Sequence, residues 1–207
     1  MKSKPDKLTS TRWSLIRRLQ NCDDHEGWQD FLESYWRLLY STAMRAGLTD
    51  AEAQDAVQET VISVCRNIRQ LEMSSEAGSF KNWLMKMARW RIVDQLRKRR
   101  PHPSLVLREQ GPDELDEGLE DPAGQELERI WDEEWRNNLT TAALAKVRRQ
   151  SSARHFQIFY LYAVQGTPVA KVTAATGAAA DEVYLVKHRL APLFEKAVKA
   201  VEACQRD

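Results

Sequence analysis

Nearly half of the residues that oppose helix formation lie in one stretch of this sequence. Of its 8 glycines and 7 prolines, seven fall between residues 101 and 124. Glycine and proline break regular secondary structure, so this stretch is predicted to be an extended linker. A chain of 207 residues with such a linker near its middle is expected to form two small domains rather than one large domain.

Charge is distributed along the chain in three parts, which agree with two domains joined by a linker. Residues 1–100 carry 18 Lys and Arg against 13 Asp and Glu, residues 101–135 carry 2 against 12, and residues 136–207 carry 11 against 5. The formal net charge of +1 therefore hides two basic segments on either side of an acidic one. This distribution favours two modules that face nucleic acid, joined by a connector that repels it, although solvated surface charge would give the same counts.

Composition limits the class of protein. The chain is 43% hydrophobic and 29% charged, which favours a folded protein over a collagen-like or disordered one. No run approaches the roughly 18 consecutive apolar residues that span a bilayer, and the amino-terminal sequence MKSKPDKLTS lacks the apolar segment of a secretory signal. A cytoplasmic protein with no membrane insertion is therefore expected.

Residues that often carry chemistry show no recognisable arrangement. The three cysteines and four histidines lack metal-ligand spacing, so neither a metal site nor a disulfide framework is expected. The sequence also has no phosphate-binding loop, no HExxH motif and no Ser/His/Asp arrangement. We therefore expect no enzyme activity, no catalytic residue and no cofactor.

Before the linker, apolar residues recur at the spacing of helices. Those from Trp28 to Ala46 return every three or four positions, which predicts a helix that ends at Gly47. Thr49 and Glu52 have the spacing of a capping box, which predicts that a second helix begins there. A short helix is also expected from Thr11 to Leu19.

The second of these helices has a polar side. Its apolar residues recur from Val57 to Ile68 and leave Asp55, Gln58 and Glu59 outside the buried stripe. Solvation and a binding site for a partner explain such an acidic and amide-bearing side equally well.

A third helix is expected from Phe80 to about Arg100, with Ser79 as its N-cap. At 100° per residue its apolar side consists of Phe80, Leu84, Met87, Ala88 and Ile92. The opposite side carries Lys86, Arg89, Trp90 and Arg97. Cations neutralise phosphates, and a ring that stacks on an unpaired base contributes about 1–3 kcal/mol, so this side favours single-stranded nucleic acid. Packing of Trp90 against the first helix or the amino-terminal segment is the alternative.

After the linker, the sequence has the pattern of a helix-turn-helix. A short helix is predicted from Pro168 to Ala175, with Thr167 as its cap, a turn at Gly177 and a second helix from about Asp181. In such a motif the second helix enters the major groove of duplex DNA. The residues predicted to lie on or beside its outward side are Asp181, Tyr184, Leu185, Lys187, His188 and Arg189. Any helical hairpin with a glycine turn, and a merely solvated His188, would give the same pattern.

Three stretches together resemble one family of proteins. They are Asp55-Ala-Val-Gln-Glu-Thr60, Trp83-Leu-Met-Lys-Met-Ala-Arg89 with Asp94-Gln-Leu-Arg97, and Val183-Tyr-Leu-Val-Lys-His-Arg-Leu190. In order and spacing they resemble the bacterial RNA polymerase sigma factors of the extracytoplasmic-function (ECF) type. Members of that family consist of sigma region 2 and sigma region 4 with a linker between them, and the resemblance covers nearly the whole chain.

The resemblance implies a role for each stretch. The polar side of the second helix would bind core RNA polymerase through Asp55, Gln58 and Glu59. The third helix, with Gly78 and Ser79 before it, would recognise and open the −10 promoter element through Phe80, Lys81, Lys86, Arg89, Trp90 and Arg97. Region 4 would bind the −35 element through Tyr184, Lys187, His188 and Arg189. The acidic linker would follow the path of nascent RNA.

The sequence departs from the family at three places. Trp90 stands where many members have an asparagine that helps to capture a flipped base. The recognition helix opens with Asp181-Glu182, where relatives usually have small or hydroxyl residues, and Thr167-Pro168-Val169 differs from the usual acidic first helix. These departures concern which promoter sequence is preferred, because carboxylates repel phosphates but can accept a hydrogen bond from cytosine.

The sequence therefore predicts an all-α fold of two small helical domains joined by an acidic, flexible linker. Sigma region 2 is assigned to residues 8–100, the linker to residues 101–126 and the region 4 helix-turn-helix domain to residues 127–207. The predicted function is that of an alternative sigma factor at the nucleoid, which binds core RNA polymerase and directs promoter recognition, DNA melting and transcription initiation.

The expected partners are core polymerase and promoter DNA, and regulation by an anti-sigma factor is left open. One alternative is a stand-alone helix-turn-helix regulator, which would bind duplex DNA tightly without polymerase. The other is a helical adaptor protein whose basic surfaces are only solvated.

Overall fold

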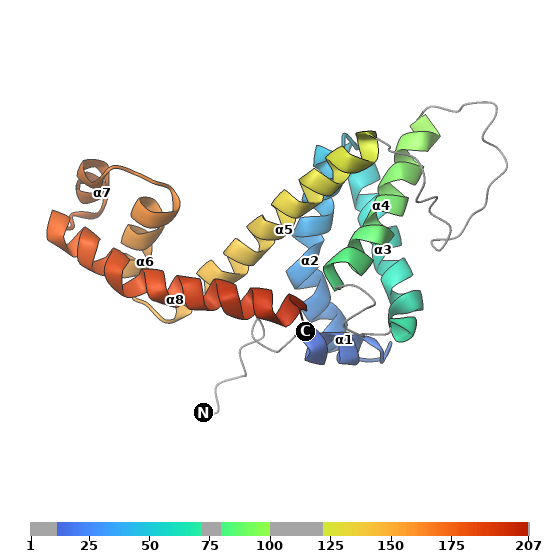
Figure 1. Cartoon of the computed structure of the whole chain (residues 1–207), viewed down its shortest axis with the longest axis horizontal. Coiled ribbons are helices and arrows are strands. Elements are labelled where there is room, and N and C mark those ends of the chain that lie inside the picture. The colour runs from blue at the N-terminus through green and yellow to red at the C-terminus, as the bar shows by residue number, and fades with distance from the viewer. Residues whose placement is uncertain (1–11, 72–79, 100–121, 207) are drawn as a thin grey trace. The chain divides into compact units, whose positions relative to one another are not determined.

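The computed structural model describes residues 12–71, 80–99 and 122–206, and every regular element in these residues is helical (Figure 1). The all-α prediction is confirmed. The chain divides into two compact units, one made of Met1–Asn138 with Gln205–Asp207 and the other of Leu139–Cys204.

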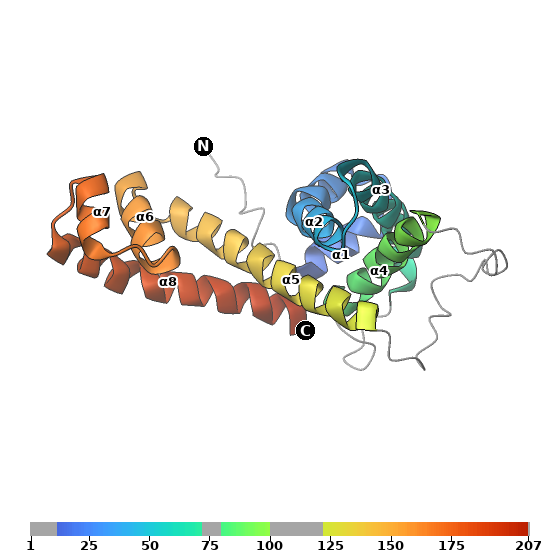
Figure 2. The ribbon, with the colours of Figure 1, turned by 90° about the horizontal axis from the view of Figure 1, so that it is seen from above.

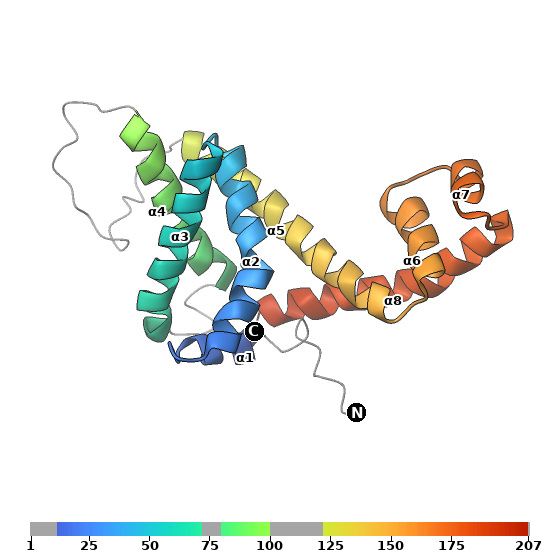
Figure 3. The ribbon, with the colours of Figure 1, turned by 180° about the vertical axis from the view of Figure 1, so that it is seen from behind.

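The first unit is built around three long helices. These are α2 (His25–Arg45), α3 (Asp50–Asn67) and α4 (Phe80–Arg99), and α3 packs against both of the others. The short helix α1 (Arg12–Leu19) packs on α2, and the 3-10 turn η1 (Ile68–Gln70) extends α3. Figure 2 shows the three long helices close to end-on, and Figure 3 shows them from the side.

Local side-chain chemistry explains where these helices begin and end. Asp24 caps α2 by accepting a hydrogen bond from the backbone N–H of Gly27 at 2.8 Å. Gly47 follows α2 with φ at +94°, a conformation that glycine adopts at little cost. At the start of α3, the backbone N–H of Thr49 donates to the Glu52 carboxylate at 2.8 Å, which agrees with the predicted capping box.

The buried side of α4 is the one that the apolar spacing predicts. Its side chains have exposed fractions of 9% or less at Phe80, Leu84, Met87, Ala88 and Ile92. They pack with apolar residues of α2 and α3, among them Tyr35, whose ring centroid lies 5.5 Å from that of Phe80. This packing orients the cationic side of α4 away from the core.

The helix α5 (Pro122–Arg149) differs from the prediction. The sequence predicts a linker to residue 126, whereas one helix runs through Gly124 and across the boundary between the units at Asn138. Proline is tolerated in the first turn of a helix because its missing N–H needs no helical partner there. The rest of the predicted linker, residues 101–121, lies outside the described residues.

Apolar spacing explains why α5 begins so early. Leu127, Ile130, Trp131 and Trp135 are all buried, with exposed fractions of 5% or less. They recur at i, i+3, i+4 and i+8, the spacing of one buried helical stripe. The first part of α5 therefore belongs to the core of the first unit, and the division between the units falls twelve residues later than the predicted domain boundary at 126/127.

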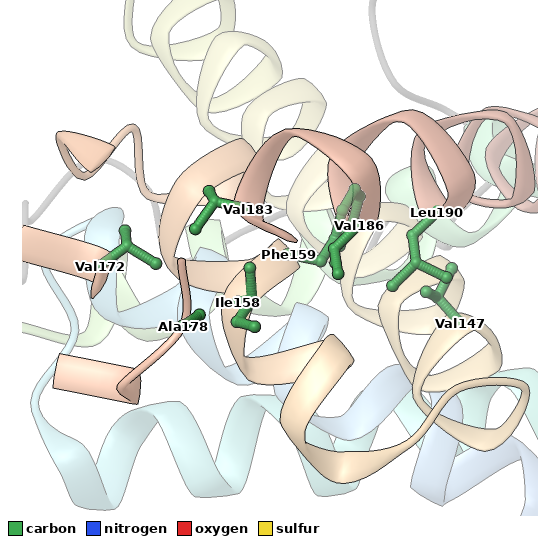
Figure 4. Packing of buried hydrophobic residues seen from close by; sticks show 8 residues of the cluster. All are labelled: Val147, Ile158, Phe159, Val172, Ala178, Val183, Val186 and Leu190. Atoms are coloured by element: carbon green, nitrogen blue, oxygen red, sulfur yellow. The ribbon is translucent and has the colours of Figure 1, made fainter. Parts of the chain in front are cut away.

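The second unit is a helix-turn-helix with its own core. It contains the end of α5, α6 (Ala153–Phe159), the π-helical turn η2 (Tyr160–Val164), α7 (Val169–Thr176) and all but the last two residues of α8 (Ala180–Arg206). Figure 4 shows the core cluster, which is Val147, Ile158, Phe159, Val172, Ala178, Val183, Val186 and Leu190. Pro168 has the extended ψ of 142° and caps α7, so this helix begins one residue later than predicted.

Candidate nucleic-acid interface

The cationic side of α4 is present, and its members differ in exposure. Lys86 and Arg97 are exposed, as the sequence predicts. Lys81 and Arg89 are half-buried, with 27% of each side chain exposed. The four cations therefore lie along one helix, but only two of them are open to solvent.

Two carboxylates of α5 form ion pairs with the two half-buried cations. The Nζ atom of Lys81 lies 2.7 Å from an oxygen of Asp132, and a guanidinium nitrogen of Arg89 lies 3.3 Å from an oxygen of Glu128. Both contacts are ion pairs at the edge of the first unit. The sequence did not indicate them, because the partners are far apart along the chain.

A third cation is held by the same helix. Arg45, at the end of α2, donates to Glu133 at 2.5 Å and to Glu134 at 2.8 Å. The hydrogen bonds to these carboxylates raise the pKa of Arg45, and Arg45 in turn lowers the pKa of Glu133. Sequence reasoning assigned no role to Arg45, and a lone arginine near a helix end gives no signal for one.

Trp90 is half-buried rather than fully exposed. The guanidinium carbon of Arg91 lies 4.1 Å from the centroid of the indole, a cation–π contact. Arg91 also donates to the Ser63 hydroxyl at 2.8 Å and pairs with Glu59 at 3.3 Å. Arg91 thus connects the indole to α3, and it was missing from the predicted site.

Phe80 does not belong to the surface. Its side chain is only 5% exposed, and its ring packs against Tyr35 and against Trp83, whose centroid is 5.7 Å away. The prediction that Phe80 contacts DNA disagrees with this packing, and the apolar spacing of α4 already pointed to burial. The neighbouring Gly78 and Ser79 lie outside the described residues.

The polar side of α3 is exposed as predicted. Asp55, Gln58 and Glu59 all face solvent, and they line a shallow groove of about 450 Å³ between α3 and α4. From α4 the groove is lined by Arg91, Asp94, Gln95 and Lys98. It carries charges of both signs, which suits a polar protein surface better than a nucleic acid.

The predicted recognition helix also presents its residues to solvent. Tyr184, Lys187, His188 and Arg189 are all exposed on α8, while Val183, Val186 and Leu190 of the same helix are buried. Tyr162 supports two of them from η2. Its ring meets that of Tyr184 edge-on at 5.8 Å, and the Lys187 Nζ atom lies 5.4 Å above it.

The carboxylates at the start of α8 differ in their surroundings. Glu182 pairs with Arg154 of α6 at 3.1 Å, and this hydrogen-bonded contact lowers the pKa of Glu182. Its negative charge is therefore partly compensated within the protein, whereas Asp181 is exposed. Of the two carboxylates, Asp181 is the better placed to affect DNA binding.

Within the described residues, no group of three or more His, Cys, Asp or Glu side chains is arranged to hold a metal ion. No helix in the same part of the chain is both long enough and apolar enough to cross a membrane.

Comparisons with known proteins cover the chain unevenly. No curated protein sequence matches it. The chain is similar to a solved structure described as "Structure of CnrH in complex with the cytosolic domain of CnrY", with 14% sequence identity, coverage of 94% of this chain and 99% of that chain, and a TM-score of 0.36. Residues 31–102, which contain α3, α4 and most of α2, match the family model Sigma-70 region 2.

Proposed function

We propose that this protein is a sigma factor of the ECF type, which binds core RNA polymerase and directs promoter recognition, DNA melting and transcription initiation. The observation that carries the proposal is the match of residues 31–102 to Sigma-70 region 2. The polar side of α3 and the cations of α4 both lie within this segment.

The chemistry of each surface supports its proposed partner. Asp55, Gln58 and Glu59 stand together on an exposed polar surface that suits the core polymerase. The cations Lys81, Lys86, Arg89 and Arg97 and the indole of Trp90 suit the opened −10 element, because phosphates need cations and unpaired bases need a stacking surface.

The second unit supports the −35 assignment. A helix-turn-helix places its second helix in the major groove, and α8 exposes one aromatic ring, two cations and His188 on that helix. The same unit would also suit a stand-alone DNA-binding regulator.

Reconstituted transcription tests the proposal. Purified protein is added to sigma-free core polymerase with genomic DNA, and the 5′ ends of the transcripts are sequenced. We expect start sites that share upstream elements and are absent with core polymerase alone. Random start sites, together with tight sequence-specific binding of duplex by the protein itself, would instead identify a stand-alone regulator.

A double substitution tests the polymerase-binding surface. We expect Q58A/E59A to weaken association with core polymerase at least about tenfold, in line with the loss of two interface contacts, while the thermal unfolding midpoint changes little because both side chains are exposed. The matched control is Q54A on the exposed surface of the same helix. Wild-type affinity of the double variant in fluorescence titrations would remove this surface from the proposal.

A further inference from the structure

The first part of α5 covers one side of the candidate −10 surface. This acidic segment, Gly124–Asn138, contains five carboxylates and two arginines. Four of its carboxylates form ion pairs with cations of α2 and α4. The segment is therefore bound to the same helix that is proposed to bind DNA.

Two of these pairs use cations of the proposed −10 site. Asp132 holds Lys81 at 2.7 Å and Glu128 holds Arg89 at 3.3 Å. A phosphate would bind to the same ammonium and guanidinium groups, whose positive charges these carboxylates already compensate. DNA and the acidic segment therefore compete for the two cations.

The backbone of α5 adds a steric barrier at Arg89. A methyl group built on Gly124 would lie only 2.4 Å from the Nη2 atom of Arg89, so the guanidinium rests close against the helix. Since only 27% of the Arg89 side chain is exposed, α5 restricts the approach of a DNA backbone to that end of the guanidinium.

Aromatic packing holds the segment on the unit. Trp131 and Trp135 are each only 2% exposed, and the ring of Trp135 stacks on Tyr35 of α2 at a centroid distance of 5.9 Å. Burial of two indoles gives the contact its main free energy, because the partly exposed ion pairs contribute little each, about 0–1 kcal/mol.

The contact also has features that favour release. The ion pairs to Lys81 and Arg89 are weakened by salt and can be replaced by a more highly charged polyanion.

We propose that the acidic segment is an intramolecular inhibitor, in which Asp132 and Glu128 pair with Lys81 and Arg89 and must release these two cations before DNA can bind through them. The inference rests on the proposed function, because it assumes that these two cations bind DNA. It assigns the carboxylates of α5 a regulatory role at that site.

Binding of a single-stranded oligonucleotide by the full-length protein tests the inference. The variant E128Q/D132N removes the two competing charges but keeps the shape of the side chains and the buried indoles. The probe is a fluorescein-labelled single strand of mixed sequence, and anisotropy is measured at constant ionic strength. We expect the Kd to fall at least about fivefold, the lower end of typical coupling between two sites.

The matched control is E133Q/E134Q. It changes the net charge by the same amount on the same helix, but its carboxylates pair with Arg45, which lies outside the proposed DNA site. We expect its Kd to change less than about twofold, the scale of long-range charge effects in salt. An equal gain in both variants would show that bulk charge, and not occupation of the site, limits binding.

Substitution of the cations separates this inference from the proposed function. K81A/R89A should abolish the gain of E128Q/D132N when the two pairs of changes are combined. If K81A/R89A weakens binding but E128Q/D132N has no effect, the inhibitor is wrong and the DNA site stands. If K81A/R89A has no effect in either background, the proposed DNA site itself is wrong. A urea unfolding curve, monitored by tryptophan fluorescence, confirms that each variant is folded.

Discussion

Asp24 shows how one side chain organises the first turn of α2. Its carboxylate accepts hydrogen bonds from the Gly27 N–H at 2.8 Å and from two guanidinium nitrogens of Arg18 at 2.8 and 2.9 Å. The pKa of Asp24 is lowered from 3.8 to about 2, mainly by the hydrogen bonds from Arg18 and next by the one from Gly27. The charged form is therefore favoured by the folded protein.

This shift makes the contribution of Asp24 depend on pH. A carboxylate whose pKa is lower in the folded state stabilises the fold above its unfolded pKa, and this stabilisation is lost as the pH falls through the folded pKa. We expect D24N to lower Tm by about 3 °C at pH 7, and we expect this difference to shrink as the pH falls from about 5 towards the folded pKa of about 2. D23N, at an exposed neighbour, is the control. A Tm difference that stays constant over this pH range would contradict the role of the charge.

Cys22 and Cys65 form a pair that the sequence did not reveal. Both are free thiols, and their sulfur atoms lie 3.8 Å apart. The pKa of Cys65 is raised mainly by burial and, to a smaller extent, by the hydrogen bond to Cys22. A guanidinium nitrogen of Arg69 lies 3.8 Å from the Cys22 sulfur. Scattered cysteines favoured no disulfide framework, because proximity across 43 positions depends on how α1, α2 and α3 pack.

We expect a mild thiol oxidant such as diamide to join this pair. The two thiols would give up two protons and two electrons to the azo group, and the disulfide would raise Tm by at least about 5 °C, because it closes a long loop in the unfolded chain. The experiment uses a C204S background, and C65S serves as the control. An unchanged thiol count after oxidation would show that the sulfur atoms do not approach.

At the scale of elements, Gly177 fixes the turn of the helix-turn-helix. It caps α7 with φ at +66°, and a side chain placed there would meet no neighbour within 4 Å. A substitution therefore acts through the backbone alone. We expect G177A to destabilise the second unit by about 1 kcal/mol, and G177N by less, because asparagine tolerates the left-handed region better. Hydrogen exchange of α7 and α8 measures both, and equal protection in the alanine variant would contradict the argument.

Local rules predicted the elements whose ends depend on local chemistry. The Thr49–Glu52 box, the turns at Gly47 and Gly177 and the buried stripe of α4 follow from a few neighbouring residues. The start of α5 does not, because the burial of Trp131 and of Trp135, which stacks on Tyr35, outweighs the weak helix propensity of Gly124. A rule that treats glycine and proline as breakers cannot include that distant contact.

The same limit applies to the candidate site. The sequence placed Lys81, Arg89 and Trp90 on one helix correctly, because a helix repeats regularly. It could not show that Glu128 and Asp132 occupy the two cations or that Arg91 covers the indole. Ion pairs between residues about forty or fifty positions apart are set by tertiary packing and leave no pattern in one sequence.

At the scale of the whole molecule, the proposed function assigns different parts of a promoter to the two units. We expect K187A/R189A in the second unit to reduce transcription from promoters that depend on the −35 element about tenfold or more, since each lost base or phosphate contact costs about 1–3 kcal/mol. Initiation on a template that lacks the −35 element and is already melted at −10 should be unaffected. K196A, an exposed lysine farther along α8, is the control.

K81A/R89A in the first unit should give the opposite result. Binding to the −35 element should persist, whereas strand opening should slow. The permanganate reactivity of unpaired thymines measures strand opening. If both pairs of substitutions impair the same step on every template, the two units do not act on separate promoter elements.

The position of the unit boundary inside α5 determines where the protein can be cut. A carboxy-terminal fragment that starts at residue 127 would carry Trp131 and Trp135 without the Tyr35 surface that buries them, and it would expose two indoles that promote aggregation. An amino-terminal fragment that stops at residue 126 would lose the same indoles from its own core. Fragments divided near Leu139 keep each hydrophobic cluster intact and are the ones suited to separate expression.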